Sequence, residues 1–238
     1  NLIIFINMTF LIAVQLKDSI VVAIDNKYLI LKYKSLDQYM EYLDSKLYTW
    51  HSGFITGVGE HYVIDKAVHL FINNFNSEIE KLPICLNISK QVREMEIGCH
   101  EQIQLSKILY SSYSKNGAKL FSVEPTEESG IYQISEFREN DLIIWLFNPN
   151  IQNISENLRN LYTNPRPRAS FDRIEDWVDH YISAISEIYV KQSRVDSLMS
   201  RSFDIFFQTK DQYFYKHIEN DQSTIIELNE ISNNIDFI

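Results

Sequence analysis

Residues 8–25 read MTFLIAVQLKDSIVVAID, with Thr9 near the start and Asp25 at the end. Two short apolar runs flank the polar segment Lys17-Asp18-Ser19. Apolar runs of this length bounded by a polar turn are typical of paired β-strands. The segment therefore predicts two strands joined by a turn, and the second strand closes on a carboxylate.

This pattern resembles the opening of proteasome β subunits, which begin with a threonine, an apolar strand, a turn and a strand that ends in aspartate. A bacterial relative that works with an ATPase ring opens in the same way. On this resemblance the chain is identified as a divergent bacterial member of the N-terminal-nucleophile (Ntn) hydrolases, over roughly residues 9–218. The resemblance and the order of elements imply an α+β fold, a four-layer αββα sandwich with two antiparallel sheets between helix layers.

The chemistry explains why the threonine matters. A threonine hydroxyl is a weak nucleophile and needs a base within hydrogen-bond reach. The α-amine of the same residue can serve, because its pKa of roughly 7.7–8 lies near working pH. A lysine ammonium nearby would favour the neutral amine, and an aspartate would hold that lysine. We interpret Thr9 as nucleophile and base and Asp25 as the orienting carboxylate; alternatively, both are ordinary strand residues.

The segment KLYTWHSGFITGVGE, residues 46–60, resembles the third and fourth strands of the family. On this match Lys46 is the catalytic lysine, and the backbone N–H of Gly59 faces the oxyanion, where a missing Cβ lets the substrate approach. Lys46 lies farther along the chain than the family norm, so Lys32 and Lys34 are rivals. The alternative for Gly59 is a plain turn before a helix.

Two further assignments come from the resemblance. Asp196 matches a supporting aspartate by its spacing to the strand at 203–205, and Ser200 approximately matches the serine that helps to poise the amine. The family's Gly-Ser-Gly turn is replaced here by Leu146-Phe147-Asn148-Pro149, and the usual glycine near Ser200 is absent. The alternative for Asp196 is a solvated carboxylate at a helix end.

Residues 1–8 precede the candidate nucleophile, and residues 2–14 are almost wholly apolar. We expect a leader or upstream extension that is absent from the mature protein, with Met8 removed before the small Thr9. A signal peptide would need a basic start and a cleavage site, and a membrane span would need about 20 apolar residues. The predicted division is therefore 1–8 leader, 9–218 Ntn-hydrolase domain and 219–238 polar tail.

Composition limits the function. The 238 residues are 45% hydrophobic, enough for one sizeable core, and the net charge of −10 argues against nucleic-acid binding. Arg166, Arg168 and Arg173 are the nearest approach to a basic patch. Cys85 and Cys99 show no metal or redox spacing and are expected as reduced thiols. We expect no cofactor, no metal, no membrane contact and a cytoplasmic location.

Apolar periodicity and turn signals predict the remaining elements. We expect helices over 35–45 (capped by Ser35), 61–75 and 86–96, and a long helix that begins at Ser170. A strand over Gln102–Ser114 should turn at Asn116-Gly117. Met95 and Cys99 are expected in the core.

These observations favour a proteasome-like threonine peptidase or amidohydrolase that acts on a peptide or protein substrate. The family resemblance implies a homo-oligomer, with a ring by analogy, and leaves an ATPase partner open. The alternative is a catalytically inactive homologue that serves as a scaffold or partner-binding subunit. The replaced Gly-Ser-Gly turn and any retention of residues 1–8 favour that alternative.

Overall fold

The computed structural model describes residues 3–7, 9–32, 39–146 and 150–220, with side chains from residue 9 to 29 and again from residue 40 onward within those ranges. Two compact units divide the chain. Unit 1 comprises Asn1–Met8, Lys27–Ser111 and Leu120–Glu136, and unit 2 comprises Thr9–Asn26, Ser112–Lys119 and Phe137–Ile238. Each unit is described by itself below.

Unit 2 contains a five-stranded antiparallel sheet in the order β11-β2-β3-β12-β13. The two strands predicted from the opening sequence are its centre. The strands are β2 (Leu11–Gln15), β3 (Ile20–Asp25), β11 (Leu142–Trp145), β12 (Phe203–Gln208) and β13 (Tyr213–Ile218). Every residue of β2, β3 and β12 is buried, which explains their nearly continuous apolar sequence.

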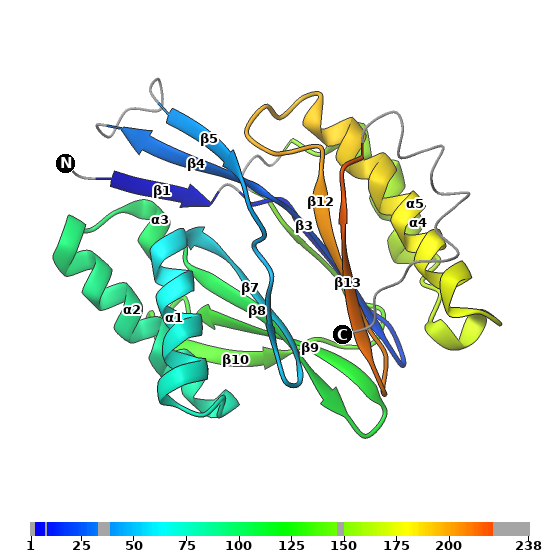
Figure 1. Cartoon of the computed structure of the whole chain (residues 1–238), viewed down its shortest axis with the longest axis horizontal. Coiled ribbons are helices and arrows are strands. Elements are labelled where there is room, and N and C mark those ends of the chain that lie inside the picture. Colours follow the sequence, from blue (N-terminus) through cyan, green and yellow to red (C-terminus); the bar gives the residue numbers. More distant parts are fainter. Residues whose placement is uncertain (1–2, 8, 33–38, 147–149, 221–238) are drawn as a thin grey trace. The chain divides into compact units, whose positions relative to one another are not determined.

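Helices α4 (Ser155–Thr163) and α5 (Ile174–Ser193) complete unit 2, with the short 3-10 helices η2 (Gln152–Ile154) and η3 (Arg168–Ser170). Figure 1 shows α4 and α5 running beside each other. The buried stripe of α5 recurs at helical spacing and packs into one core with β2, β3 and β12. The predicted long helix therefore exists, but it begins at Ile174. Ser170 does not cap it, because Ser170 closes η3 and its N–H donates to the Pro167 carbonyl.

Unit 1 is built on an antiparallel sheet in the order β10-β9-β8-β7-β1-β4-β5, with β6 paired to β7. Its strands are β1 (Ile3–Asn7), β4 (Lys27–Lys32), β5 (Tyr39–Leu43), β6 (Tyr48–Trp50), β7 (Gly53–Glu60), β8 (Lys107–Ser114), β9 (Gly117–Pro125) and β10 (Tyr132–Glu136). The turn between β8 and β9 follows the predicted Asn-Gly signal and belongs to unit 2.

Helices α1 (His61–Asn74) and α2 (Leu82–Ile97), with η1 (Ile79–Lys81) and α3 (Glu101–Gln104), complete unit 1. Figure 1 shows α1 and α2 side by side. The predicted helix 61–75 is confirmed, and its buried residues Val63, Ile64, Ala67, Val68 and Phe71 pack with α2 in the core of unit 1. The helix predicted at 86–96 is confirmed as part of α2.

The helix predicted over 35–45 is wrong where the structure describes it, because residues 39–43 form strand β5; Ser35 lies outside the described residues. Pairing with β4 overrides the local helical pattern. The Tyr28 and Tyr42 rings stack at 4.9 Å, and Lys27 Nζ lies 2.8 Å from Glu41 Oε1.

Three smaller expectations also fail. Met95 is 79% exposed, because the buried face of α2 carries Leu82, Cys85, Leu86, Ser89 and Arg93 and leaves Met95 on the opposite side. Cys99 follows the helix and is exposed. The strand predicted from Gln102 begins only at Lys107, since residues 101–104 form α3, capped by the His100 side chain.

Candidate active site

Thr9 and Asp25 lie at the same end of the paired strands β2 and β3 in unit 2. Thr9 is 3% exposed and Asp25 is fully buried. Asp25 Oδ1 accepts the Phe10 N–H at 2.8 Å, and the Asp25 N–H donates to the Phe10 carbonyl at 3.0 Å. Phe10 is covalently joined to Thr9, so these two hydrogen bonds fix the threonine beside a buried carboxylate. The structure thus brings two of the predicted site residues together.

Tyr189 of α5 is a site residue that the sequence analysis missed. Its hydroxyl donates to the Phe10 carbonyl at 2.8 Å, and its ring meets the Phe10 ring edge-on with centroids 5.0 Å apart. Burial, followed by the charges of Asp25 and Asp204, raises the pKa of Tyr189 well above its usual range. The phenol therefore stays a neutral donor and secures the backbone next to Thr9. The one sequence signal for Tyr189 was its position at helical spacing on the buried face of α5.

Ser200 is tied to the residue that follows Asp25. Ser200 Oγ accepts the Asn26 N–H at 3.0 Å and lies 2.8 Å from Asn26 Oδ1. Ser202 Oγ donates to the same Asn26 Oδ1 at 2.9 Å. All three side chains are at most 7% exposed. Asn26 and Ser202, which the sequence analysis did not single out, thus join the predicted Ser200 to the end of β3.

Asp196 is 9% exposed and lies in the turn after α5. Its N–H donates to the Gln192 carbonyl at 2.9 Å, and its Oδ1 accepts the Leu198 N–H at 3.0 Å. The carboxylate therefore shapes the loop that leads to Ser200 and β12. It is not the solvated helix-end group of the alternative interpretation.

Lys46, the predicted lysine, belongs to unit 1 and is 1% exposed. Its Nζ lies 5.1 Å from the centroid of the Tyr28 ring, and its carbonyl accepts the Thr56 hydroxyl at 2.7 Å. The His61 ring meets the same tyrosine edge-on, with centroids 4.8 Å apart. Burial lowers the pKa of His61, and the Lys46 charge acts in the same direction against the opposing charge of Asp65. A lysine buried this deeply is uncommon unless its ammonium is held by specific partners.

Gly59, the predicted oxyanion residue, adopts φ +107°, a region that favours glycine. A Cβ there would lie 2.5 Å from Ser106 Cα, and Gly59 pairs in register with Asn7 of β1. Close packing inside unit 1 therefore requires glycine at this position. The next residue, Glu60, donates its N–H to Ser106 Oγ at 3.1 Å, which fixes the backbone on the other side.

The two rival lysines fall at the edge of what the structure describes. Lys32 ends β4, and its side chain is not described; Lys34 lies outside the described residues. Of the segment that replaces the Gly-Ser-Gly turn, residues 147–149 also lie outside them. Asn150, just beyond, accepts the Gln192 side-chain amide at its carbonyl at 3.0 Å.

Residues before Thr9 take part in the sheet of unit 1. β1 pairs with β4 along Ile3–Ile6 and with β7 at Ile6 and Asn7. In this chain the nitrogen of Thr9 lies in the peptide bond to Met8. An α-amine at Thr9 therefore requires that this bond be cleaved.

Among the described residues, no group of three or more His, Cys, Asp or Glu side chains is arranged to hold a metal ion. No helix within those residues is both long enough and apolar enough to cross a membrane.

Comparison with known proteins establishes the fold. No family model and no curated protein matches the sequence. Solved structures do match: Anbu (ancestral beta-subunit) from Yersinia bercovieri has 9% identity and a TM-score of 0.61, with 93% of this chain and 92% of that chain covered. The chain has an Anbu-type fold.

Two further Anbu structures agree. The Gly-1 mutant of Anbu from Hyphomicrobium sp. strain MC1 has 14% identity and a TM-score of 0.59, with 94% of each chain covered. The helical assembly of the Anbu complex from Pseudomonas aeruginosa has 10% identity and a TM-score of 0.63, with 94% and 92% covered. Anbu proteins have the proteasome-like Ntn fold, so the predicted fold class, helices with antiparallel sheets, is confirmed.

Proposed function

We propose that this chain is a proteasome-like subunit that hydrolyses peptide or amide bonds with the Thr9 hydroxyl. The observation that carries the proposal is the 2.8 Å hydrogen bond from the Phe10 N–H to Asp25 Oδ1, which fixes a buried carboxylate beside Thr9. The Anbu-type fold supports the same conclusion.

In the proposed reaction, cleavage of the Met8–Thr9 bond first frees the Thr9 amine. The amine takes the hydroxyl proton as Thr9 Oγ1 attacks the substrate carbonyl carbon. The proton then passes to the leaving amine as the C–N bond breaks, which leaves an ester on Thr9. Water hydrolyses this ester, with the α-amine again acting as base, and the threonine is restored.

The other residues have supporting roles in this proposal. Lys46 would favour the neutral amine, Asp25 would orient Lys46, and the Gly59 N–H would donate to the oxyanion. This requires the Lys46 ammonium within about 4–6 Å of the Thr9 hydroxyl and the Asp25 carboxylate. Asp196 would hold the loop that carries Ser200, and Ser200 would poise the amine through Asn26.

The quaternary state and the partners form part of the proposal. One matched structure is a helical assembly of the Anbu complex, and by analogy we propose that this chain forms homo-oligomers. The substrate is proposed to be a peptide or protein. The proposal includes no assignment of an ATPase partner.

Covalent labelling tests the proposed chemistry. The full chain is treated with an epoxyketone or a β-lactone and its mass is measured under denaturing conditions, because a cleaved β1 would stay hydrogen-bonded between β4 and β7. We expect a chain that begins at Thr9 and carries one adduct. Thr9→Ala should abolish the adduct, whereas Thr49→Ala, at an exposed threonine of β6, should keep it.

A specific observation favours a second candidate, an inactive scaffold or partner-binding subunit. Residues Ile3–Asn7 form β1 between two other strands, so the segment before Thr9 contributes to the sheet. A chain that keeps Met8 and never acquires the adduct would support this candidate and overturn the first.

A further inference from the structure

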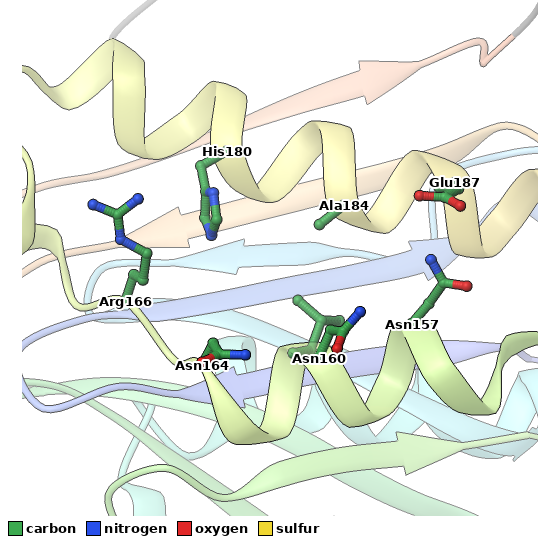
Figure 2. Close-up of a pocket in the computed structure, with 8 residues that line it drawn as sticks. Asn157, Asn160, Asn164, Arg166, His180, Ala184 and Glu187 are labelled. Carbon is green, nitrogen blue, oxygen red and sulfur yellow. The ribbon is translucent and has the colours of Figure 1, made fainter.

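A pocket that has several polar side chains in its lining lies between α4 and α5 of unit 2, apart from the Thr9 cluster. Its volume is about 290 Å³, near the lower end of the range of roughly 300–1,000 Å³ typical of small-molecule sites. Figure 2 shows its residues converging from the two helices and from the segment that follows α4. Its polar lining comprises Asn157, Asn160, Asn164, Arg166, His180 and Glu187.

Arg166 is held in place before any ligand arrives. Pro165 and Pro167 flank it and restrict the backbone on both sides. The Arg166 N–H donates to the Tyr181 hydroxyl at 3.0 Å, and that hydroxyl lies 3.1 Å from the Arg166 carbonyl. The guanidinium carbon stands 4.1 Å from the centroid of the Phe171 ring. The backbone of Arg166 is thus held, and the ring contact orients its exposed guanidinium, which lowers the entropy cost when the guanidinium binds an anion.

The charge at this end of the pocket is not neutralised. Across the described part of the chain, the Arg166 guanidinium donates no hydrogen bond to an acceptor and forms no ion pair; its only partner is the Phe171 ring. His180 beside it is held neutral, because burial and the Arg166 charge lower its pKa. A planar guanidinium with open N–H donors matches a carboxylate in a bidentate geometry.

The opposite end of the pocket is electrically balanced. Glu187 Oε1 lies 2.6 Å from Lys191 Nζ, and the same ammonium donates to Asn157 Oδ1 at 2.9 Å. This ion pair leaves little net charge to attract an ammonium. The pocket is therefore selective for negative charge at the Arg166 end only, on a chain whose net charge is −10.

The wall between the two ends carries asparagine amides. Asn157, Asn160 and Asn164 are spaced three and four residues apart along α4 and its C-cap, a spacing that puts them on one face. Figure 2 shows them along the α4 side of the pocket. An asparagine amide offers one acceptor and two donors, which is the complement of a peptide group. The row spans about 10 Å, the length of about three extended residues.

We propose that the α4–α5 pocket binds a short peptide of about three residues through its free C-terminal carboxylate. Arg166 takes the carboxylate, and Asn160 and Asn164 pair with the main chain of the peptide. The binding does not depend on the proposed function. Only the source of the ligand does, since short peptides with free carboxylates are what a peptidase releases.

Calorimetric titration of the full-length Thr9→Ala protein tests the proposal without turnover, so its outcome is distinct from that of the labelling experiment. Three probes are compared: trialanine, its C-terminal amide and its N-acetyl form. We expect trialanine to bind, the amide to bind about tenfold more weakly or not at all, and the N-acetyl form to retain its affinity. An amide that binds as tightly as trialanine, or no binding by trialanine at millimolar concentration, overturns the proposal.

Matched variants localise the site. Arg166→Gln should weaken trialanine binding about tenfold or more. Arg159→Gln, at an exposed arginine of α4 outside the pocket, should leave it unchanged. Circular dichroism checks that both variants fold. Equal loss in both variants, or acetate binding as tightly as trialanine, would overturn the assignment to a peptide.

Discussion

Two fully buried carboxylates end strands in the two units, and their surroundings differ. Glu60 ends β7 in unit 1, where Arg93 donates to its Oε1 from Nη2 at 2.9 Å and from Nε at 3.2 Å. Its Oε2 accepts the Val63 N–H and so caps α1. Asp25 ends β3 in unit 2, and its Oδ1 accepts the Phe10 N–H beside a buried threonine.

The difference separates a structural carboxylate from a candidate catalytic one. Glu60 caps the start of α1 and forms an ion pair with Arg93, and its neighbour Gly59 packs against Ser106. Asp25 is joined through Phe10 to Thr9 and through Asn26 to Ser200, both of them hydroxyl side chains. Burial alone therefore does not distinguish the two carboxylates, whereas their hydrogen-bond partners do.

The largest expected effect comes from breaking the Glu60–Arg93 pair. Arg93→Met leaves a buried carboxylate without its cation, which should cost about 3–5 kcal/mol of unfolding free energy. Denaturant unfolding at neutral pH measures it. Burial already raises the pKa of Glu60 despite Arg93. The loss should therefore shrink as pH falls and Glu60 takes up a proton.

A control variant on the same helix keeps this test specific. Lys90→Met removes a cation that lies 5.9 Å from the Tyr132 ring centroid. It should lower the unfolding free energy by about 0.5–1 kcal/mol, much less than Arg93→Met does. Adding Glu60→Gln to Arg93→Met should recover part of the loss. Equal costs for the two single variants would mean that the pair is not what stabilises unit 1.

Asp25→Ala tests the other carboxylate. The Phe10 N–H would be left buried without its acceptor, which should cost about 1–3 kcal/mol. Adduct formation at Thr9 should be lost in this variant, whereas the structural variant Lys90→Met should keep it. A stable Asp25→Ala protein that still labels at the wild-type rate would show that Asp25 only ends a strand.

At the site itself, a smaller effect than that of Asp25→Ala is expected at Tyr189. Tyr189→Phe removes the hydrogen bond to the Phe10 carbonyl, worth about 1 kcal/mol at neutral pH. The folded-state pKa of Tyr189 is raised well above the unfolded value near 10, so its contribution is complete below pH 10 and is lost as pH rises beyond it. The gap in stability between wild type and Tyr189→Phe should therefore narrow above pH 10. A stability difference that stays constant above pH 10 would contradict the conclusion that the Tyr189 phenol is buried and neutral.

Much of the secondary structure could be predicted from local sequence patterns. The α1 stripe lies within one helix, and the Asn116-Gly117 turn needs only its flanking strands, so periodicity and turn chemistry were sufficient. β5 was mistaken for a helix because its apolar residues fall on one helical face, and the pairing with β4 that makes it a strand is not visible in the local sequence. Met95 was misplaced because the sequence does not show which face of α2 meets α1.

The sequence by itself determined the paired strands that bring Thr9 and Asp25 to the same end of the sheet, because two apolar runs joined by a short turn pair with each other as a hairpin. It could not show Tyr189 against Phe10, 179 residues away, or Asn26 against Ser200, 174 residues away. Those contacts depend on how α5 and the loops pack on the sheet of unit 2. Packing of this kind is decided by the shape and burial of side chains distant in the sequence, which only the tertiary structure reveals.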